Sequence, residues 1–347
     1  MKRGLRALLL VAAANLAGLT GVAKADDAAL TPREQRRGEE QTFLTFPEWY
    51  LVYSPAELAQ FLSLQRAPSE FPWGGHIAQF WQGYREMTRE TKAYPFNGGY
   101  HLMVSVIGTS TTVEYGLRSA YESTLGRLAE ASSDGTSTAE DRLAARVAKA
   151  YVDFIRVDPW YLFDFHAPLR ELWTTTPLTG ANLLRKWERR FALTTEYAIK
   201  AGYGWLIKLG TRSVYDTAHP LTAVVLDRTP APLPSGLREW RRIDSGDGAV
   251  LITVPRYHAF MAYAQALAEQ GLGFREIAGN RGPIVASVVD RIGTAAPASP
   301  QHMIFVQPIL TQPGWERRVI ALPVPELAAQ LRRWRAADVH LEHLYDY

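Results

Sequence analysis

The sequence predicts an α+β protein of two domains, in which a mainly helical, aromatic-rich N-terminal domain precedes a ferredoxin-like α+β domain. Three observations carry this prediction. Apolar residues recur at helical spacing over the first two thirds of the chain, and short β-rich runs dominate the last third. Between them lies the proline-rich stretch RTPAPLPSG, which is typical of an extended linker. We therefore expect a helical domain over residues 26–228, a linker over 229–248 and an α+β domain over 249–347.

The first 25 residues have the three parts of a secretory signal peptide. Three cations lie among the first six residues, an apolar stretch begins at Ala7, and the triplet at 23–25 reads Ala-Lys-Ala. The alternative is an uncleaved membrane anchor, because about 17 mildly apolar residues approach the ~20 that span a bilayer. Both alternatives predict an exported protein, either periplasmic or anchored to the outer face of the cytoplasmic membrane.

Charge and cysteine content restrict the partners and the chemistry. Four of the 38 Lys and Arg residues lie in the first 25 residues, which contain no acid, so residues 26–347 carry 34 basic against 35 acidic side chains, a net charge of −1. Such a balance gives little attraction for phosphate backbones, so no nucleic-acid partner is expected. With 0 Cys, disulfides, thiol catalysis and cysteine-based zinc sites are excluded.

Capping signals and breakers predict the first helices. Ser54, Pro55 and Glu57 match a capping box, so a helix is expected from Ser54 through residue 64. FPWGG at 71–75 and YPFNGG at 94–99 are turn signals, and a helix is expected to begin at His76 between them.

The stretch from Gly99 to Ser123 has two different faces if it is a helix. One is apolar, and the other could line a site or allow another helix to approach closely at Gly108. Gly and β-branched residues weaken the helix prediction, so a strand remains an alternative over 100–115. The apolar stripe comprises Met103, Val106, Val113, Leu117 and Ala120, and the second stripe His101, Ser105, Gly108, Thr112, Tyr115, Ser119 and Glu122.

Two more helices are expected before the linker. The spacing of Leu143, Val147 and Tyr151 predicts one that ends before Pro159. Residues 182–210 form a long amphipathic segment whose charged residues argue against a membrane span. We favour a packed amphipathic helix, although its Tyr, Trp and Lys content also suits a membrane surface.

The last third of the chain contains strand–helix–strand twice, which predicts a mainly antiparallel sheet with helices on one face. Asn280-Arg281-Gly282 is interpreted as a hairpin turn. The expected helices cover 257–269 and 325–334, and the expected strands cover 249–254, 274–279, 284–290, 302–310, 317–322 and 339–347.

No strong catalytic or nucleotide-binding motif is present. His340 and Glu342 would share one face of a strand and could hold a metal, but polar residues on the exposed face of a terminal strand explain them better. We therefore predict no metal site and no cofactor.

The candidate site lies in the N-terminal domain. Four polar residues, Glu48, His76, His101 and Glu114, are the catalytic candidates, because His and carboxylate pairs can move protons near neutral pH. The structural alternatives are helix capping for the histidines and an ion pair with Arg118 for Glu114. Aromatic residues predicted to form the apolar wall of the site are Trp49, Tyr50, Trp81, Tyr84 and Tyr115.

Three functions are compatible with these features, and whether the protein is an enzyme stays open. The first is an exported protein that binds an apolar or lipid-like small molecule, or that acts as an envelope accessory factor, with association to a membrane surface or a protein partner. The second is an enzyme with a His/carboxylate acid–base site. The third is a structural docking module of an envelope assembly, for which a broad exposed apolar patch would be the evidence.

Overall fold

The computed structural model describes residues 30–347 except 212–220, 235, 238–240, 245–248 and 295–301. The predicted signal peptide and parts of the predicted linker lie outside the described residues. Within the described chain, residues 49–80 and 103–211 form one compact unit, called the helical unit here. Residues 30–48, 81–102 and 221–347 form the other, called the sheet unit. The boundary falls inside three helices, so each of these contributes residues to both units.

Helices make up the N-terminal part of the chain, as predicted. The stretch that could have been a helix or a strand is helical throughout, and the long segment near residue 200 is one continuous helix. The helices are α2 (Gln41–Ser63), α3 (Trp73–Glu90), α4 (Gly98–Tyr121), a π-helical turn (Glu122–Gly126), α5 (Arg127–Ala131), α6 (Ala139–Ile155), α7 (His166–Thr175) and α8 (Leu183–Thr211). Short 3-10 turns occupy Arg33–Gln35, Pro68–Glu70, Thr91–Ala93, Trp160–Leu162 and Val324–Glu326.

The first helix begins earlier than its capping signal predicts. It starts at Gln41, so Ser54 lies inside α2 and its hydroxyl bonds the Tyr115 hydroxyl at 2.8 Å instead of capping a helix. The burial of Phe46 and other apolar side chains of the preceding segment explains the difference, because packing outweighs a local cap. A complete capping box occurs at Thr138 and Asp141, at the start of α6.

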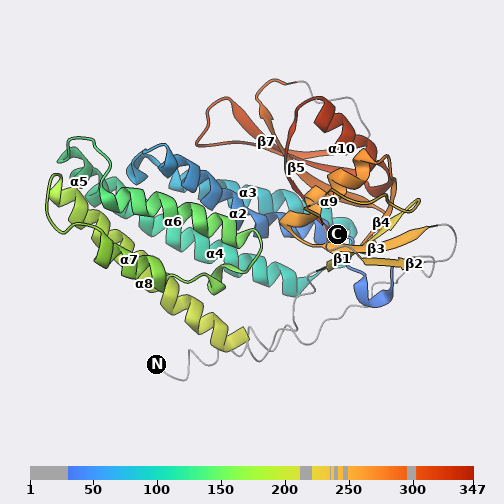
Figure 1. The fold of residues 1–347 in the computed structure, drawn as a ribbon, viewed down its shortest axis with the longest axis horizontal. Coiled ribbons are helices and arrows are strands. Elements are labelled where there is room, and N and C mark those ends of the chain that lie inside the picture. The colour runs from blue at the N-terminus through green and yellow to red at the C-terminus, as the bar shows by residue number, and fades with distance from the viewer. Residues whose placement is uncertain (1–29, 212–220, 235, 238–240, 245–248, 295–301) are drawn as a thin grey trace. The chain divides into compact units, whose positions relative to one another are not determined.

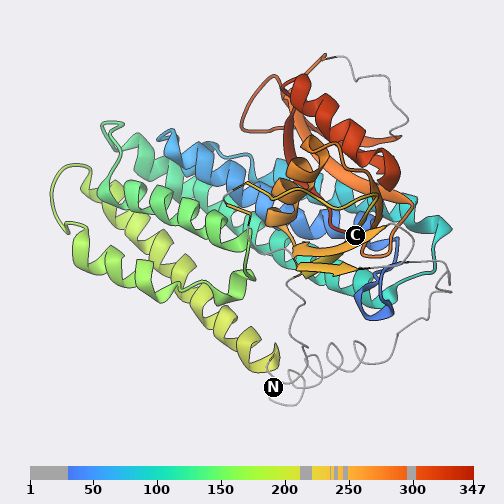
Figure 2. The same ribbon diagram turned by 45° about the vertical axis from the view of Figure 1, so that its right-hand side comes forward.

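A compact apolar cluster joins α6, α7 and α8, which lie side by side in Figures 1 and 2. Each helix supplies apolar side chains at three- and four-residue spacing, which is the pattern that predicted α6. A second cluster in this unit is aromatic. The first contains Leu143, Phe165, Leu172, Leu193 and Tyr197, and the second Phe61, Phe71, Trp73 and Tyr115.

The C-terminal part contains two antiparallel sheets of four strands, with orders β2-β3-β1-β4 and β6-β7-β5-β8. The elements are β1 (Leu221–Leu226), β2 (Arg241–Asp244), β3 (Val250–Pro255), α9 (His258–Glu269), β4 (Phe274–Ile277), β5 (Pro283–Arg291), β6 (His302–Pro308), β7 (Trp315–Pro323), α10 (Leu327–Ala336) and β8 (His340–Leu344). Both sheets follow the same sequence of three strands, one helix and one strand. The chain therefore repeats one topology that no sequence repeat indicates.

The two strand–helix–strand segments predicted from the sequence are β3-α9-β4 and β7-α10-β8. Both β3 and β4 pair antiparallel with β1, which lies between them, so they run parallel to each other and need a helical crossover. Such split β-α-β units also build the ferredoxin-like fold. The predicted hairpin at Asn280-Arg281-Gly282 is wrong, because β4 and β5 belong to different sheets.

One apolar core serves both sheets and includes side chains of α9 and α10, which contact each other. Alternate residues of β1 show how the first sheet is covered on both faces. Val224 and Leu226 belong to the shared core, whereas Ala223 and Val225 join a smaller cluster with Leu30. No helix in the described ranges is long and apolar enough to span a bilayer.

Cleavage in the predicted linker provides a test of the first sheet. β1 precedes residue 229, yet it pairs with β3 and β4, which follow the linker. We therefore expect limited proteolysis between about residues 228 and 248 to give two fragments that co-elute in size-exclusion chromatography and separate only in denaturant. Fragments that separate under native conditions would contradict the pairing of β1.

Candidate functional site

His76 lies in a closed polar network inside the helical unit. It occupies the first turn of α3, has no exposed surface, and its ring stacks on Phe71 with centroids 4.6 Å apart. Its Nδ1 lies 3.1 Å from the Tyr50 hydroxyl, which donates to Gln79 at 3.0 Å, and its Nε2 lies 3.7 Å from a Glu57 carboxylate oxygen. A ligand would reach this imidazole only if the surrounding aromatic side chains moved.

Glu114 belongs to a second network, which joins α4 to α8. It lies 3.1 Å from Arg118 and 3.3 Å from Lys200, and both cations also pair with Glu196. Burial raises the pKa of Glu114, but the charges of Lys200 and Arg118 outweigh burial and lower it below its usual value. Glu196 responds in the same way, and its pKa falls to about 2. Both carboxylates are held ionised and are weak bases, which suits ion pairing better than proton transfer.

Glu48 lies in the sheet unit and is half-buried. Burial raises its pKa to about 7, against the opposing effects of a hydrogen bond from Tyr100 and the charge of Arg256. Arg256 itself binds Asp346 at 2.8 Å and the hydroxyl of Tyr347. A carboxyl group that titrates near neutral pH beside a fixed arginine is suited to acid–base work, although buried structural pairs produce similar shifts.

His101 lies in the sheet unit, beside Tyr84. Its Nδ1 is 2.9 Å from the Tyr84 hydroxyl, its ring stacks on the exposed Phe96 with centroids 4.9 Å apart, and burial lowers its pKa. Thus His76 and Glu114 belong to the helical unit, and Glu48 and His101 to the sheet unit. Each has its own cluster of contacts.

The predicted aromatic wall is divided in the same way. Trp49, Tyr50 and Tyr115 belong to the helical unit, and Trp81 and Tyr84 to the sheet unit, where their rings are 6.0 Å apart. Tyr50 is 1% exposed and Tyr115 6% exposed, so these two serve as core residues.

No group of three metal-ligating side chains occurs in the part of the chain that is described. His340 and Glu342, near the C-terminus, are the two residues considered above as metal ligands. Glu342 accepts two hydrogen bonds from Arg317, of 2.6 and 2.8 Å, and His340 is exposed.

The interior of the helical unit is unusually rich in charge. Arg189 makes two hydrogen bonds of 2.9 Å with Glu122, and Arg190, which is 1% exposed, binds the fully buried Glu140 at 2.7 Å. All the charged side chains of α8 are buried or half-buried: Arg185, Lys186, Glu188, Arg189, Arg190, Glu196, Lys200 and Lys208.

The exposed side of α8 is mostly apolar, in contrast to its charged buried side. Among the described side chains of this helix, none of the exposed ones carries a charge. Phe191, Ile199 and Trp205 are each at least 60% exposed. The other exposed residues are Leu183, Leu184, Trp187, Thr195, Ala198, Gly202, Tyr203, Leu206 and Leu209.

Helix α4 has the same inverted distribution, in which charged side chains are half-buried and large apolar side chains are exposed. Its buried positions in the helical unit are Val104, Gly108 and Tyr115, while Val113 and Leu117 are 56% and 68% exposed. The small polar stripe noted in the sequence therefore faces inward, and most of the apolar stripe faces out.

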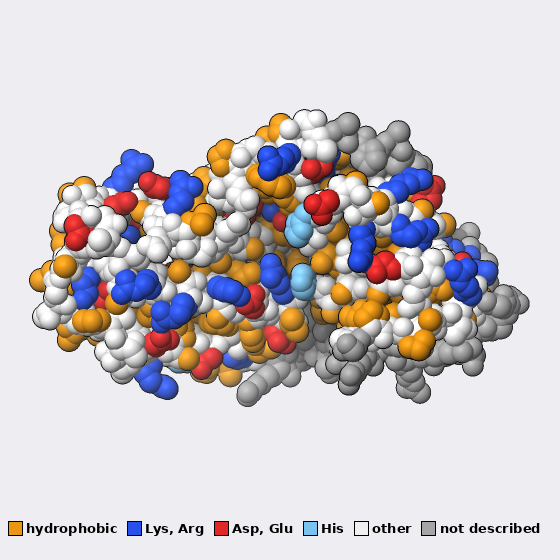
Figure 3. All heavy atoms as spheres, turned by 45° about the horizontal axis from the view of Figure 1, so that its top comes forward, with side chains coloured by type: hydrophobic (Ala, Val, Ile, Leu, Met, Phe, Trp, Pro, Cys, Tyr) orange, Lys and Arg blue, Asp and Glu red, His pale blue; other side chains and the backbone are white. Residues whose placement is uncertain are grey.

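Helix α6, in the same unit, has the ordinary distribution. Helix α6 exposes Arg142, Arg146, Lys149 and Asp153 and buries Leu143. Charged side chains of both signs are likewise spread among hydrophobic ones on the face shown in Figure 3.

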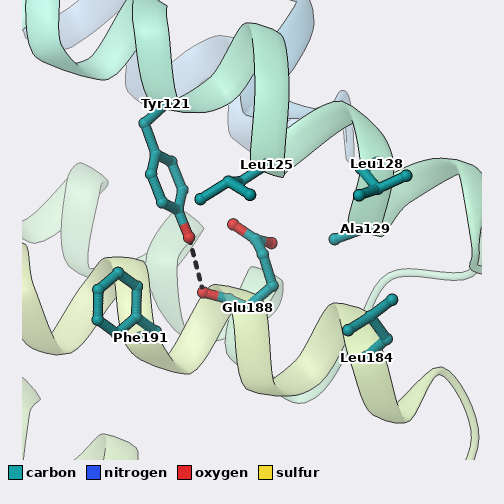
Figure 4. A pocket seen from close by; sticks show the side chains of 7 residues that line it. All are labelled: Tyr121, Leu125, Leu128, Ala129, Leu184, Glu188 and Phe191. Atoms are coloured by element: carbon teal, nitrogen blue, oxygen red, sulfur yellow. Dashed lines mark hydrogen bonds between the residues drawn. The ribbon is translucent and has the colours of Figure 1, made fainter.

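Side-chain contacts link α4 to α8 beside their exposed residues. The pairs Arg118–Glu196 and Glu114–Lys200 hold the two helices together, and the rings of Tyr121 and Phe191 stack 6.3 Å apart. Figure 4 shows a hollow where side chains from α4, α5, α8 and the π-helical turn meet. It is open, has a volume of about 240 Å³, and is lined by Tyr121, Leu125, Leu128, Ala129, Leu184, Glu188 and Phe191. We call the exposed side chains of α4 (106–120) and α8 (183–209) the apolar face.

Sequence reasoning did not find the apolar face. Both helices carry an apolar stripe and a polar stripe, and the periodicity does not say which one is buried. The available signal was the acid content of neighbouring segments, because Glu122, Glu140 and Asp141 pair with arginines of α8. No protein-family model, curated protein or solved structure matches this chain.

Proposed function

We propose that this is an exported accessory protein of the cell envelope that docks on an apolar partner through the apolar face. Docking is assigned to the helical unit, which carries the apolar face, and not to the sheet unit. Export follows from the expected signal peptide or anchor at residues 1–25.

The inverted distribution of charge on α4 and α8 is the observation that supports docking. Leaving large apolar side chains in water forgoes about 1.5–3 kcal/mol for each one that could be fully buried, and burying ion pairs carries a desolvation cost. A monomer alone in water gains nothing from this arrangement. It becomes favourable when a non-aqueous surface covers α4 and α8.

A single-cysteine experiment tests docking, because the natural chain has 0 Cys. Ile199→Cys and Leu117→Cys place a thiol on the apolar face, and Ala150→Cys places one on the exposed side of α6 as the matched control. In purified protein a maleimide should label all three. In isolated cell envelopes we expect the first two to be protected at least tenfold and position 150 to be labelled as before. Equal labelling of all three positions in envelopes would contradict the proposal.

Acid–base catalysis at Glu48 is the second candidate function. It is supported by the near-neutral pKa of this carboxyl and by the cluster of Tyr100, Arg256 and Asp346 around it. The complete burial of His76 gives no support to a role for that histidine as a proton donor in an open cleft.

A further inference from the structure

We propose that the apolar face docks on the interfacial layer of a lipid bilayer, with α4 and α8 lying along the membrane surface. This inference rests on the docking function proposed above and names its partner. It commits to lipid, and a protein partner, a second copy of this chain or the chain's own N-terminal segment are outcomes that the test separates.

The length and polarity of the face favour lipid over protein. At about 1.5 Å per residue, the face extends for about 40 Å along α8 (183–209) and for about 22 Å along α4 (106–120). A protein interface of that size usually has a polar rim and about one hydrogen bond per 100–200 Å². The apolar face offers few hydrogen-bonding groups, namely isolated hydroxyls such as those of Thr109, Ser110 and Thr195 and the ring N–H or O–H groups of its Trp and Tyr residues. An acyl-chain boundary needs no hydrogen-bonding partners.

Its aromatic residues are of the kind that settles at membrane interfaces. Trp187, Tyr203 and Trp205 are 44%, 43% and 62% exposed on α8. Indole and phenol rings combine an apolar body with a polar group and are enriched where hydrocarbon meets water. Aliphatic residues such as Ile199 and Leu206 lie beside them on the helix and would enter the acyl boundary.

The rest of the sequence is compatible with this location. The apolar stretch that begins at Ala7 is expected to direct the chain to a membrane or to anchor it there. The near-neutral charge of residues 26–347 and the uncharged face predict binding that depends little on lipid charge. This distinguishes the proposed contact from that of a basic amphipathic helix, which needs anionic lipid.

A position-specific fluorescence measurement tests the contact in the full chain. The environment-sensitive dye NBD is attached to Ile199→Cys, Leu117→Cys or the control Ala150→Cys. Vesicles of phosphatidylcholine alone, or of phosphatidylethanolamine with phosphatidylglycerol, are then added. We expect a blue shift and quenching by nitroxide-labelled lipid at positions 199 and 117, with both vesicle types, and neither effect at 150. Because the readout is local, binding through the N-terminal segment does not imitate it.

Charge on the face should weaken the contact. We expect the double variant Ile199→Glu/Leu117→Glu, read through NBD at Trp205→Cys, to need about tenfold more lipid for the same response, because each substitution removes an apolar contact and adds a charge. The matched control is Ala150→Glu, which should leave the lipid requirement unchanged. Both carboxylates replace exposed side chains, and thermal melting verifies that the variants are folded.

The other outcomes separate lipid docking from docking in general. Probes at 199 and 117 that are shielded before vesicles are added would show that the chain itself or a second copy covers the face, which overturns the proposal. Probes that stay exposed with vesicles would also overturn it. If vesicles have no effect but positions 199 and 117 are protected from maleimide in envelopes, the docking proposal holds and the partner is a protein. If these positions are not protected in envelopes either, the docking proposal is wrong as well.

Discussion

Glu140→Ala is expected to destabilise the protein by about 3–5 kcal/mol, because it leaves the buried Arg190 without its counter-ion. Glu140 is fully buried, and its carboxylate lies 2.7 Å from the Arg190 guanidinium. The remaining acceptors of Arg190 include the carbonyl oxygens of Thr176 and Pro177 at 3.2 Å, which do not neutralise its charge. Equilibrium unfolding in urea measures the change.

Glu171→Ala is the matched control. This glutamate pairs with Arg146 at 2.6 Å in the same unit, but both side chains are exposed, 42% and 62% respectively. An exposed pair contributes about 0–1 kcal/mol. Similar losses for the two variants would show that the Glu140–Arg190 pair is not shielded from water, and would remove the contrast between interior and exterior on which the docking proposal depends.

Glu48→Gln is expected to stabilise the protein above neutral pH, by up to about 3 kcal/mol at pH 8. Burial raises the pKa of this carboxyl from 4.5 to about 7, so the folded chain holds its proton more tightly than the unfolded chain does. Stability is therefore lost as pH rises from about 4.5 to about 7. The amide does not titrate, can accept the hydrogen bond from Tyr100, and should remove this part of the pH dependence.

Urea unfolding at pH 5 and pH 8 tests the direction of this pH dependence. The difference in unfolding free energy between variant and wild type should be larger at pH 8 than at pH 5. Glu34→Gln, at an exposed position in the same unit, is the matched control for the change from carboxylate to amide. A stability difference for Glu48→Gln that is the same at both pH values would show that this carboxyl has an ordinary pKa, and would remove the support for acid–base chemistry there.

Local patterns determined the mixed α+β composition and most elements. Periodicity predicted α4, α6, α8, α9 and α10, and alternation or β-rich composition predicted the strands from β3 to β8. Two strands were missed because they lie next to the proline-rich stretch. Strand β1 is six residues long and pairs with β3 and β4, which follow it by more than 20 residues. The sequence around β1 therefore contains little of the information that makes it a strand.

The candidate polar residues show where residue-by-residue inference ends. Glu48, His76, His101 and Glu114 were selected as acids and bases flanked by aromatic or glycine signals, and each does make polar contacts. Which carboxyl stays ionised and which titrates near pH 7 depends on whether cations reach it. Lys200 and Arg118 lower the pKa of Glu114, whereas burial outweighs Arg256 at Glu48.

By itself, the sequence determined that α4 and α8 have one apolar and one polar side, because helical periodicity depends only on spacing. Only the tertiary structure decided that the polar side of each is buried. The free energy of burying Arg189 or Arg190 depends on a partner carboxylate, and those partners, Glu122 and Glu140, lie 67 and 50 residues away in the chain. Charge pairing across helices, which no local window contains, turned the apolar side outward and created the surface on which the proposed function rests.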